Sequence, residues 1–60
     1  MKLLEFEYLD GTTLRFVLDD DEEVHWTATF ACFDDAHGSI HSVCLDGIRR
    51  VIVVDEGGER

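Results

Sequence analysis

Four residues in the middle of the chain have side chains that commonly bind zinc. Cys32, His37, His41 and Cys44 follow one another with gaps of four, three and two residues. Two thiolates and two imidazoles complete a tetrahedral zinc site, and a structural metal would stabilise a chain of only 60 residues. The strand pattern argues against such a site, because it turns Cys32 and His41 inward and Cys44 outward. We therefore predict no metal and no other cofactor, and keep a zinc-stabilised domain as an alternative.

The same region holds the closest approach to a catalytic pair, since the predicted register places Cys32 opposite His41. A nucleophile needs a base within hydrogen-bonding reach and a third group that orients the base. The pattern supplies no third group, and a chain of 60 residues leaves little room for a substrate pocket. We predict that the protein is not an enzyme and has no catalytic residues.

A run of five consecutive acidic residues suggests a calcium loop at first sight. A calcium-binding loop needs acidic residues at alternate positions followed by a glycine, and this run has neither feature. We interpret it as a solvated turn that could also contact a basic partner. Its members are Asp19, Asp20, Asp21, Glu22 and Glu23.

The elements that must position these residues are predicted to be β-strands. Apolar side chains alternate with charged ones over residues 4–8, and apolar even-numbered residues recur over residues 14–18, with Val17 as an apolar residue between them. Placing Leu14 opposite Tyr8 matches the apolar residues of the two segments and leaves a three-residue loop at 10–12. A third alternating series, with apolar even-numbered residues, occupies positions 24–32. We expect this third series to pair with the second segment across the acidic turn.

Two further strands are predicted after a loop at residues 34–38. The first contains Val43, placed opposite Phe30, and the second is the apolar run 51–54. The result is an all-β chain, an antiparallel meander of about five strands. A flat sheet would leave its aromatic face exposed to solvent, so the meander should curl into a small Sm/SH3-like barrel.

We predict one small β-barrel domain over residues 1–56 and a flexible C-terminal tail over residues 57–60. No apolar run approaches the roughly 20 residues of a membrane span. The N-terminal segment lacks the apolar stretch of a signal peptide. Two cysteines are too few for a secreted disulfide scaffold. We therefore expect a cytoplasmic protein that does not contact the membrane.

The net charge of −9, from 14 acidic against 5 basic residues, limits the choice of partner. Nucleic-acid binding draws most of its affinity from cations on phosphates, so direct binding to DNA or RNA is disfavoured. A basic protein partner is favoured, and so is imitation of a phosphate backbone. The acidity could equally serve solubility alone or suit a high-salt habitat.

Two segments, Trp26–Phe33 and Ile40–Ile48, resemble the WYL domain when taken with the short loop between them. WYL domains are small Sm/SH3-like barrels found in bacterial transcription regulators and defence-associated proteins. The positions that match the family pattern are Tyr8, Trp26, Val43 and Ile48. The family's two arginines, associated with sensing nucleic acid or nucleotide, fall on His41 and Gly47. The resemblance thus implies the barrel fold and a regulatory role, but not the family's ligand site.

Together these features predict a non-enzymatic interaction or regulatory module that acts through protein contacts, like a stand-alone WYL-like domain. Its contact surface is expected to combine the acidic run with three apolar residues predicted to face outward, Val17, Ala31 and Phe33. A homodimer built on the same surface is left open. The alternative is an acidic phage or mobile-element inhibitor that imitates nucleic-acid phosphates and blocks a DNA- or RNA-handling enzyme.

Overall fold

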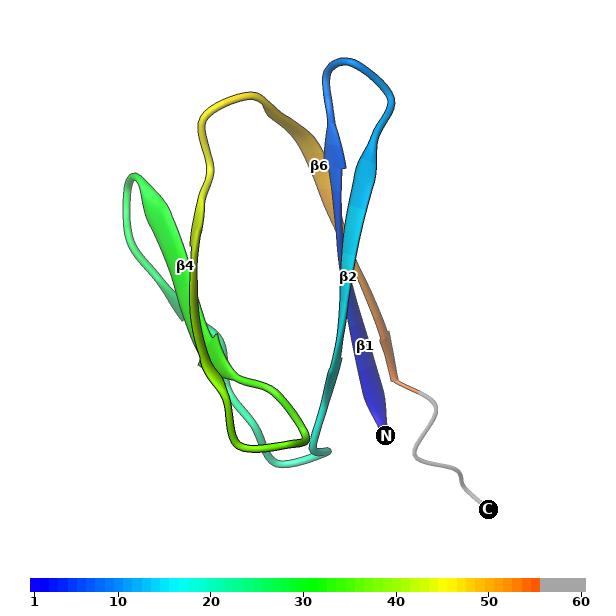
Figure 1. Ribbon diagram of the computed structural model, residues 1–60, viewed down its shortest axis with the longest axis vertical. Helices are drawn as coiled ribbons and strands as arrows, with labels where there is room; N and C mark the ends of the chain where they lie inside the picture. The colour runs from blue at the N-terminus through cyan, green and yellow to red at the C-terminus, as the bar shows by residue number, and fades with distance from the viewer. Residues whose placement is uncertain (56–60) are drawn as a thin grey trace.

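The computed structural model describes residues 1–55 as six antiparallel strands without a helix (Figure 1). The strands are β1 (Lys2–Tyr8), β2 (Thr13–Leu18), β3 (His25–Trp26), β4 (Phe30–Asp34), β5 (Ile40–Cys44) and β6 (Ile48–Asp55). The prediction of an all-β chain is confirmed. In this described part no helix is long and apolar enough to cross a membrane. The tail predicted for residues 57–60 lies outside the described residues.

The strands form two sheets of three, with the orders β2-β1-β6 and β3-β4-β5 (Figure 1). The predicted pairing of the second segment with the third is wrong, because the chain crosses from one sheet to the other after β2. A backbone hydrogen bond ties the sheets together at one end, where the Ala36 N–H of the β4–β5 loop donates to the Val17 carbonyl of β2 at 2.7 Å. The bond from the Leu9 N–H to the Gly47 carbonyl, at 2.9 Å, extends the β1–β6 pairing by one step. Two facing sheets bury their apolar sides against each other, which a flat meander cannot do.

The β1–β2 hairpin has a three-residue loop as predicted, but the loop lies one position earlier in the sequence. Phe6 pairs with Leu14, which shifts the register by two residues and leaves the inward faces unchanged. Tyr8 N–H donates to the Thr12 carbonyl at 2.8 Å, so the loop ends at Gly11, whose φ is +91°. The last loop residue needs a positive φ. Glycine adopts it at no steric cost, whereas the predicted loop would have placed the β-branched Thr12 there.

The single strand predicted for residues 24–32 is in fact a hairpin, with β3 and β4 joined by a tight turn at residues 28–29. Thr27 closes this turn with both its backbone and its side chain. Its N–H donates to the Phe30 carbonyl at 2.8 Å, and its Oγ1 accepts the Phe30 N–H at 2.9 Å. The hydroxyl therefore supplies the hydrogen bond that a turn residue such as Asn or Asp often provides.

This turn reverses which residues of β4 face the core. Trp26 pairs with Ala31 across the hairpin, so Ala31 and Phe33 point inward and are only 0% and 3% exposed. The prediction that Ala31 and Phe33 form an outward contact surface is wrong for this reason. Val43 accordingly pairs with Ala31 and not with Phe30, a slip of one residue. Because Ala31 has replaced Phe30 on the inner face, Val43 still lies in the core.

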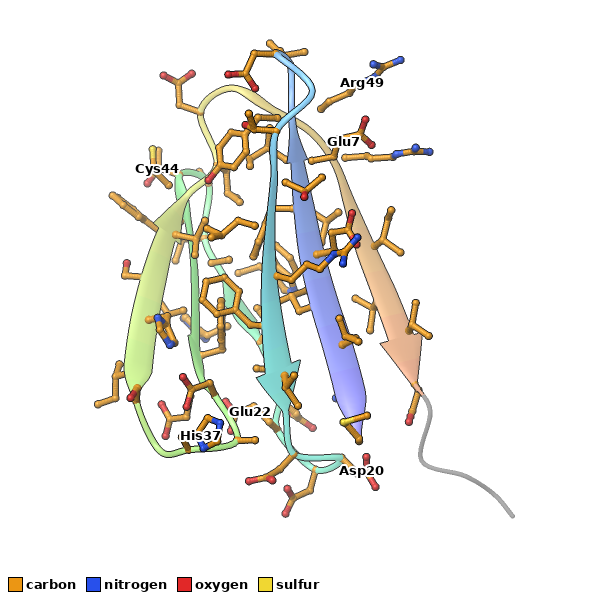
Figure 2. The ribbon with its side chains drawn as sticks, turned by 45° about the vertical axis from the view of Figure 1, so that its right-hand side comes forward. Glu7, Asp20, Glu22, His37, Cys44 and Arg49 are labelled. Carbon is orange, nitrogen blue, oxygen red and sulfur yellow. The ribbon has the colours of Figure 1, made fainter. Side chains whose placement is uncertain are left out.

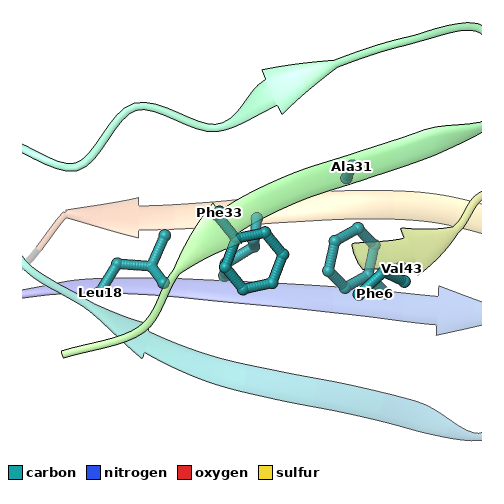
Figure 3. Close-up of a cluster of buried hydrophobic side chains, with 6 residues drawn as sticks. Phe6, Leu18, Ala31, Phe33 and Val43 are labelled. Carbon is teal, nitrogen blue, oxygen red and sulfur yellow. The ribbon is translucent and has the colours of Figure 1, made fainter. Parts of the chain in front are cut away.

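The core lies between the two sheets (Figure 3). Phe6 of β1 meets Phe33 of β4 with ring centroids 6.3 Å apart, and Phe16 meets Phe33 edge-on at 4.8 Å. These aromatic contacts join one sheet to the other. The buried apolar residues are Leu4, Phe6, Leu18, Ala31, Phe33 and Val43. With these residues inside, the outward faces of both sheets are left to solvent or to a partner.

Candidate interaction surface

The four residues considered as zinc ligands do not converge. Cys32 pairs with Ser42 on the outer face of the β3-β4-β5 sheet, and its Sγ lies 3.6 Å from the Ser42 Oγ. His41 pairs with Phe33 on the inner face, so the predicted Cys32–His41 pair is also wrong. Cys44 is exposed on the outer face, and His37 lies in the β4–β5 loop. Among residues 1–55, no group of three or more His, Cys, Asp or Glu side chains is placed to hold a metal ion.

His41 instead bonds to Asp35, with the Nε2 and Oδ2 atoms 2.7 Å apart. The other carboxylate oxygen of Asp35 accepts the backbone N–H of His37 at 2.8 Å and of Ser39 at 3.0 Å. The hydrogen bond from His41, followed by that from Ser39, lowers the pKa of Asp35 from its ordinary 3.8 to about 2. The Phe16 ring packs on the imidazole at a centroid distance of 4.6 Å. This carboxylate–imidazole pair therefore closes the β4–β5 loop against the core.

Acid should weaken this loop closure. Because the pKa of Asp35 is lower in the folded protein than its ordinary value, its contribution is complete above about pH 4 and is lost between pH 4 and 2. We expect Asp35→Asn to lower the urea midpoint at pH 7 and to flatten the decline of that midpoint from pH 4 to pH 2. Asp34→Asn, which makes the same change at the neighbouring carboxyl, should leave the decline of the urea midpoint between pH 4 and pH 2 unchanged. If the urea midpoint declined equally steeply with acid in the wild type and in Asp35→Asn, the role of Asp35 in closing the loop would be refuted.

The acidic run and the β4–β5 loop lie at the same end of the molecule, where Figure 2 labels Asp20, Glu22 and His37. The Glu22 carboxylate accepts the backbone N–H of Asp34 at 3.1 Å, and the Glu22 carbonyl accepts the Lys2 Nζ at 2.6 Å. The Asp20 carboxylate pairs with the Met1 ammonium. The run is thus a structured crossover between the sheets, and its remaining carboxylates extend the negative charge of this end.

The outer face of the β2-β1-β6 sheet carries charges that are matched. The Arg15 Nε lies 3.0 Å from the Glu5 Oε1, and the Arg50 Nε lies 2.5 Å from the Glu7 Oε1. Both carboxylates are largely covered, whereas both arginines reach into solvent.

The loops at 9–12, 19–24, 35–39 and 45–47 contain no Lys or Arg. Much of the negative charge is therefore concentrated towards the ends of the strands.

Apolar side chains adjoin these ion pairs. The β-sheet register sets Leu3 between Val17 of β2 and Val54 of β6, and sets Glu5 next to Ile52. Val17 and Val54 are 39% and 43% exposed. We call this surface the paired face; it consists of Leu3, Glu5, Glu7, Arg15, Val17, Arg50, Ile52 and Val54.

An open pocket of about 290 Å³ lies at the other sheet, which the sequence did not lead us to expect. Among the described residues that line it, Cys44 carries the one thiol and Asp46 the one carboxylate (Figure 2 labels Cys44). Within residues 1–55, the lining contains no histidine, lysine or arginine. The lining residues are Ala28, Thr29, Cys44, Leu45 and Asp46.

Of the three apolar residues predicted to face outward, only Val17 does so. The structure adds Leu3, Ile52 and Val54, which sequence reasoning missed. The signal was the unbroken apolar run 51–54, since a strand without alternation has apolar residues on both faces. Comparisons of the chain with protein-family models, curated proteins and solved structures give no match.

Proposed function

We propose that the protein is a non-enzymatic interaction module that binds another protein through the paired face. The observation that carries this proposal is the combination of exposed apolar side chains with acidic residues already matched by arginine. An interface that buries an unmatched charge loses several kcal/mol, whereas an internally matched pair costs less. Apolar area removed from water contributes about 25 cal/mol per Å². The paired face is thus the part of this acidic surface that a protein partner could cover at least cost.

A second candidate function uses the acidic end, and it is favoured by the contact between Glu22 and Asp34 that brings two acidic segments together. Carboxylates in this arrangement could imitate phosphates and occupy the basic groove of a DNA- or RNA-handling enzyme. Such a complex would form quickly and weaken steeply with added salt, because it would depend on exposed charges.

We propose in addition that the two sheets are an opened form of the Sm/SH3-like barrel, similar to a stand-alone WYL-like domain with a regulatory role. The backbone hydrogen bond between the sheets, from the Ala36 N–H to the Val17 carbonyl, supports this interpretation. The edges of β3 and β6 would form the open side of the barrel.

Two variants that each raise the net charge by two units separate the two candidate functions. Val17→Lys/Val54→Lys alters the paired face, and Asp21→Asn/Glu23→Gln alters the acidic end. Partners would be captured from the native host and quantified by mass spectrometry in low and high salt. We expect the first variant to lose the partner by roughly tenfold or more and the second to retain it, with little effect of salt. The reverse pattern would establish the acidic end as the binding surface, and retention by both variants would exclude both candidates.

A further inference from the structure

The strand β6 lies at an edge of the β2-β1-β6 sheet and carries exposed apolar side chains. β6 is the longest of the described strands and forms the end of its sheet, paired with β1 alone among residues 1–55 (Figure 1). Val53 is 54% exposed although it lies on the same side of the sheet as the buried Leu4, its partner on β1. A long apolar edge of this kind is a template for a further strand.

The hydrogen-bond alternation shows which residues turn their backbone groups toward this edge. Tyr8 bonds to Thr12, so even-numbered residues of β1 bond to β2 and odd-numbered residues bond to β6. Their partners on β6 are residues 50, 52 and 54. Val51 and Val53 therefore direct their N–H and C=O groups away from β1.

We propose that β6 pairs with β6 of a second copy of this chain, antiparallel and about a twofold axis at Ile52. In this register Val51 faces Val53 of the second copy as a hydrogen-bonded pair. The twofold axis generates a second, equivalent pair from Val53 and Val51 of the second copy. Ile52 then faces its own equivalent as a non-hydrogen-bonded pair. The two β2-β1-β6 sheets would become one continuous six-stranded sheet, and Val53 would be covered.

The charge order along β6 points to a second copy of this chain. The strand begins with Arg49 and Arg50 and ends with Asp55. Antiparallel pairing about Ile52 brings Arg49 beside Asp55 of the second copy, and does so twice. A parallel arrangement would bring like charges together. The inference goes beyond the proposed function, because it concerns the edge of the sheet and leaves the paired face accessible.

Proline at an outward-facing position tests the pairing while sparing the β1–β6 ladder, because it removes an N–H that points away from β1. Sedimentation of the full chain over a range of concentrations should show a dimer, and Val53→Pro should weaken it by roughly tenfold or more. Thr13→Pro is the matched control, since it removes an outward N–H from the opposite edge on β2 and should leave the dimer unchanged. A wild-type monomer at all concentrations, or a dimer indifferent to Val53→Pro, would overturn the proposal.

A cysteine at the axis tests the register. In a Cys32→Ser/Cys44→Ser background, Ile52→Cys should form an intermolecular disulfide on mild oxidation, because non-hydrogen-bonded antiparallel pairs lie about 4.5 Å apart at Cα. Val54→Cys should not, because its equivalent would be four residues along the strand and roughly 13 Å away. Cross-linking at Val54 but not at Ile52 would exclude this register, and an edge that binds a peptide from a different protein would give neither cross-link.

Discussion

Replacing Phe33 with alanine is expected to destabilise the protein by about 3–5 kcal/mol, whereas the same change at Phe30 should cost less than about 1 kcal/mol. Phe33 is 3% exposed, and its ring contacts those of Phe6 and Phe16 from the opposite sheet. Phe30 is 41% exposed on the outer face, opposite Cys44. A buried phenylalanine leaves a cavity when it is truncated, but an exposed one loses mainly its partial burial.

Urea unfolding followed by circular dichroism would measure both variants under the same conditions. Because the two substitutions are chemically identical and lie three residues apart, the comparison cancels the intrinsic strand preference of phenylalanine over alanine. The larger loss should appear as a lower midpoint without a large change in slope. If Phe30→Ala were the more damaging change, residues 24–32 would form one strand after all and the hairpin at residues 28–29 would be wrong.

Period-two alternation was enough to predict the class of the fold and the inward faces of the first two strands. Leu4, Phe6 and Leu18 are buried as the pattern requires. The alternation could not fix the register, because a shift by two residues keeps every side chain on its face. The register depended on Gly11, which only fits the last loop position, and sequence reasoning had placed it in the middle of the loop.

The hairpin at residues 28–29 could not be predicted from turn residues. Its loop is Ala28-Thr29, without the Gly, Pro, Asn or Asp that usually marks a turn, and the turn is closed by the Thr27 hydroxyl. Serine and threonine side chains also bond to the backbone at many positions outside turns. Thr27 therefore gave no specific turn signal in the sequence. Missing this one reversal exchanged inside and outside for Ala31 and Phe33, which are two of the three apolar residues of the predicted contact surface.

The paired face could not be predicted from the sequence for a different reason. It is built by pairing β1 with β6, which lie at opposite ends of the described chain, and neither strand alone shows the match between Glu7 and Arg50. Sequence alternation describes one strand at a time. The order of strands in a sheet depends on how the whole core closes, which local patterns do not specify.

Phe6 links the two sheets, and its loss should affect stability as strongly as that of Phe33. Its side chain is completely buried, and its ring lies 6.2 Å from that of Phe16 and 6.5 Å from that of Trp26. We expect Phe6→Ala to cost about 3–5 kcal/mol. A domain of 60 residues is stable by only about 3–9 kcal/mol, so this variant should be largely unfolded or close to it.

Phe6→Leu keeps the measurement within range, because it retains most of the apolar volume and should cost about 1–2 kcal/mol. Leu14→Ala is the matched control on the neighbouring strand. Leu14 pairs directly with Phe6 but is 39% exposed, so its truncation should cost clearly less than that of Phe6. The order Phe6→Ala, then Phe6→Leu, then Leu14→Ala follows from a core located between the sheets. A larger loss for Leu14→Ala than for Phe6→Leu would instead move the core toward the β1–β2 loop, where the predicted register had placed Leu14 beside Tyr8.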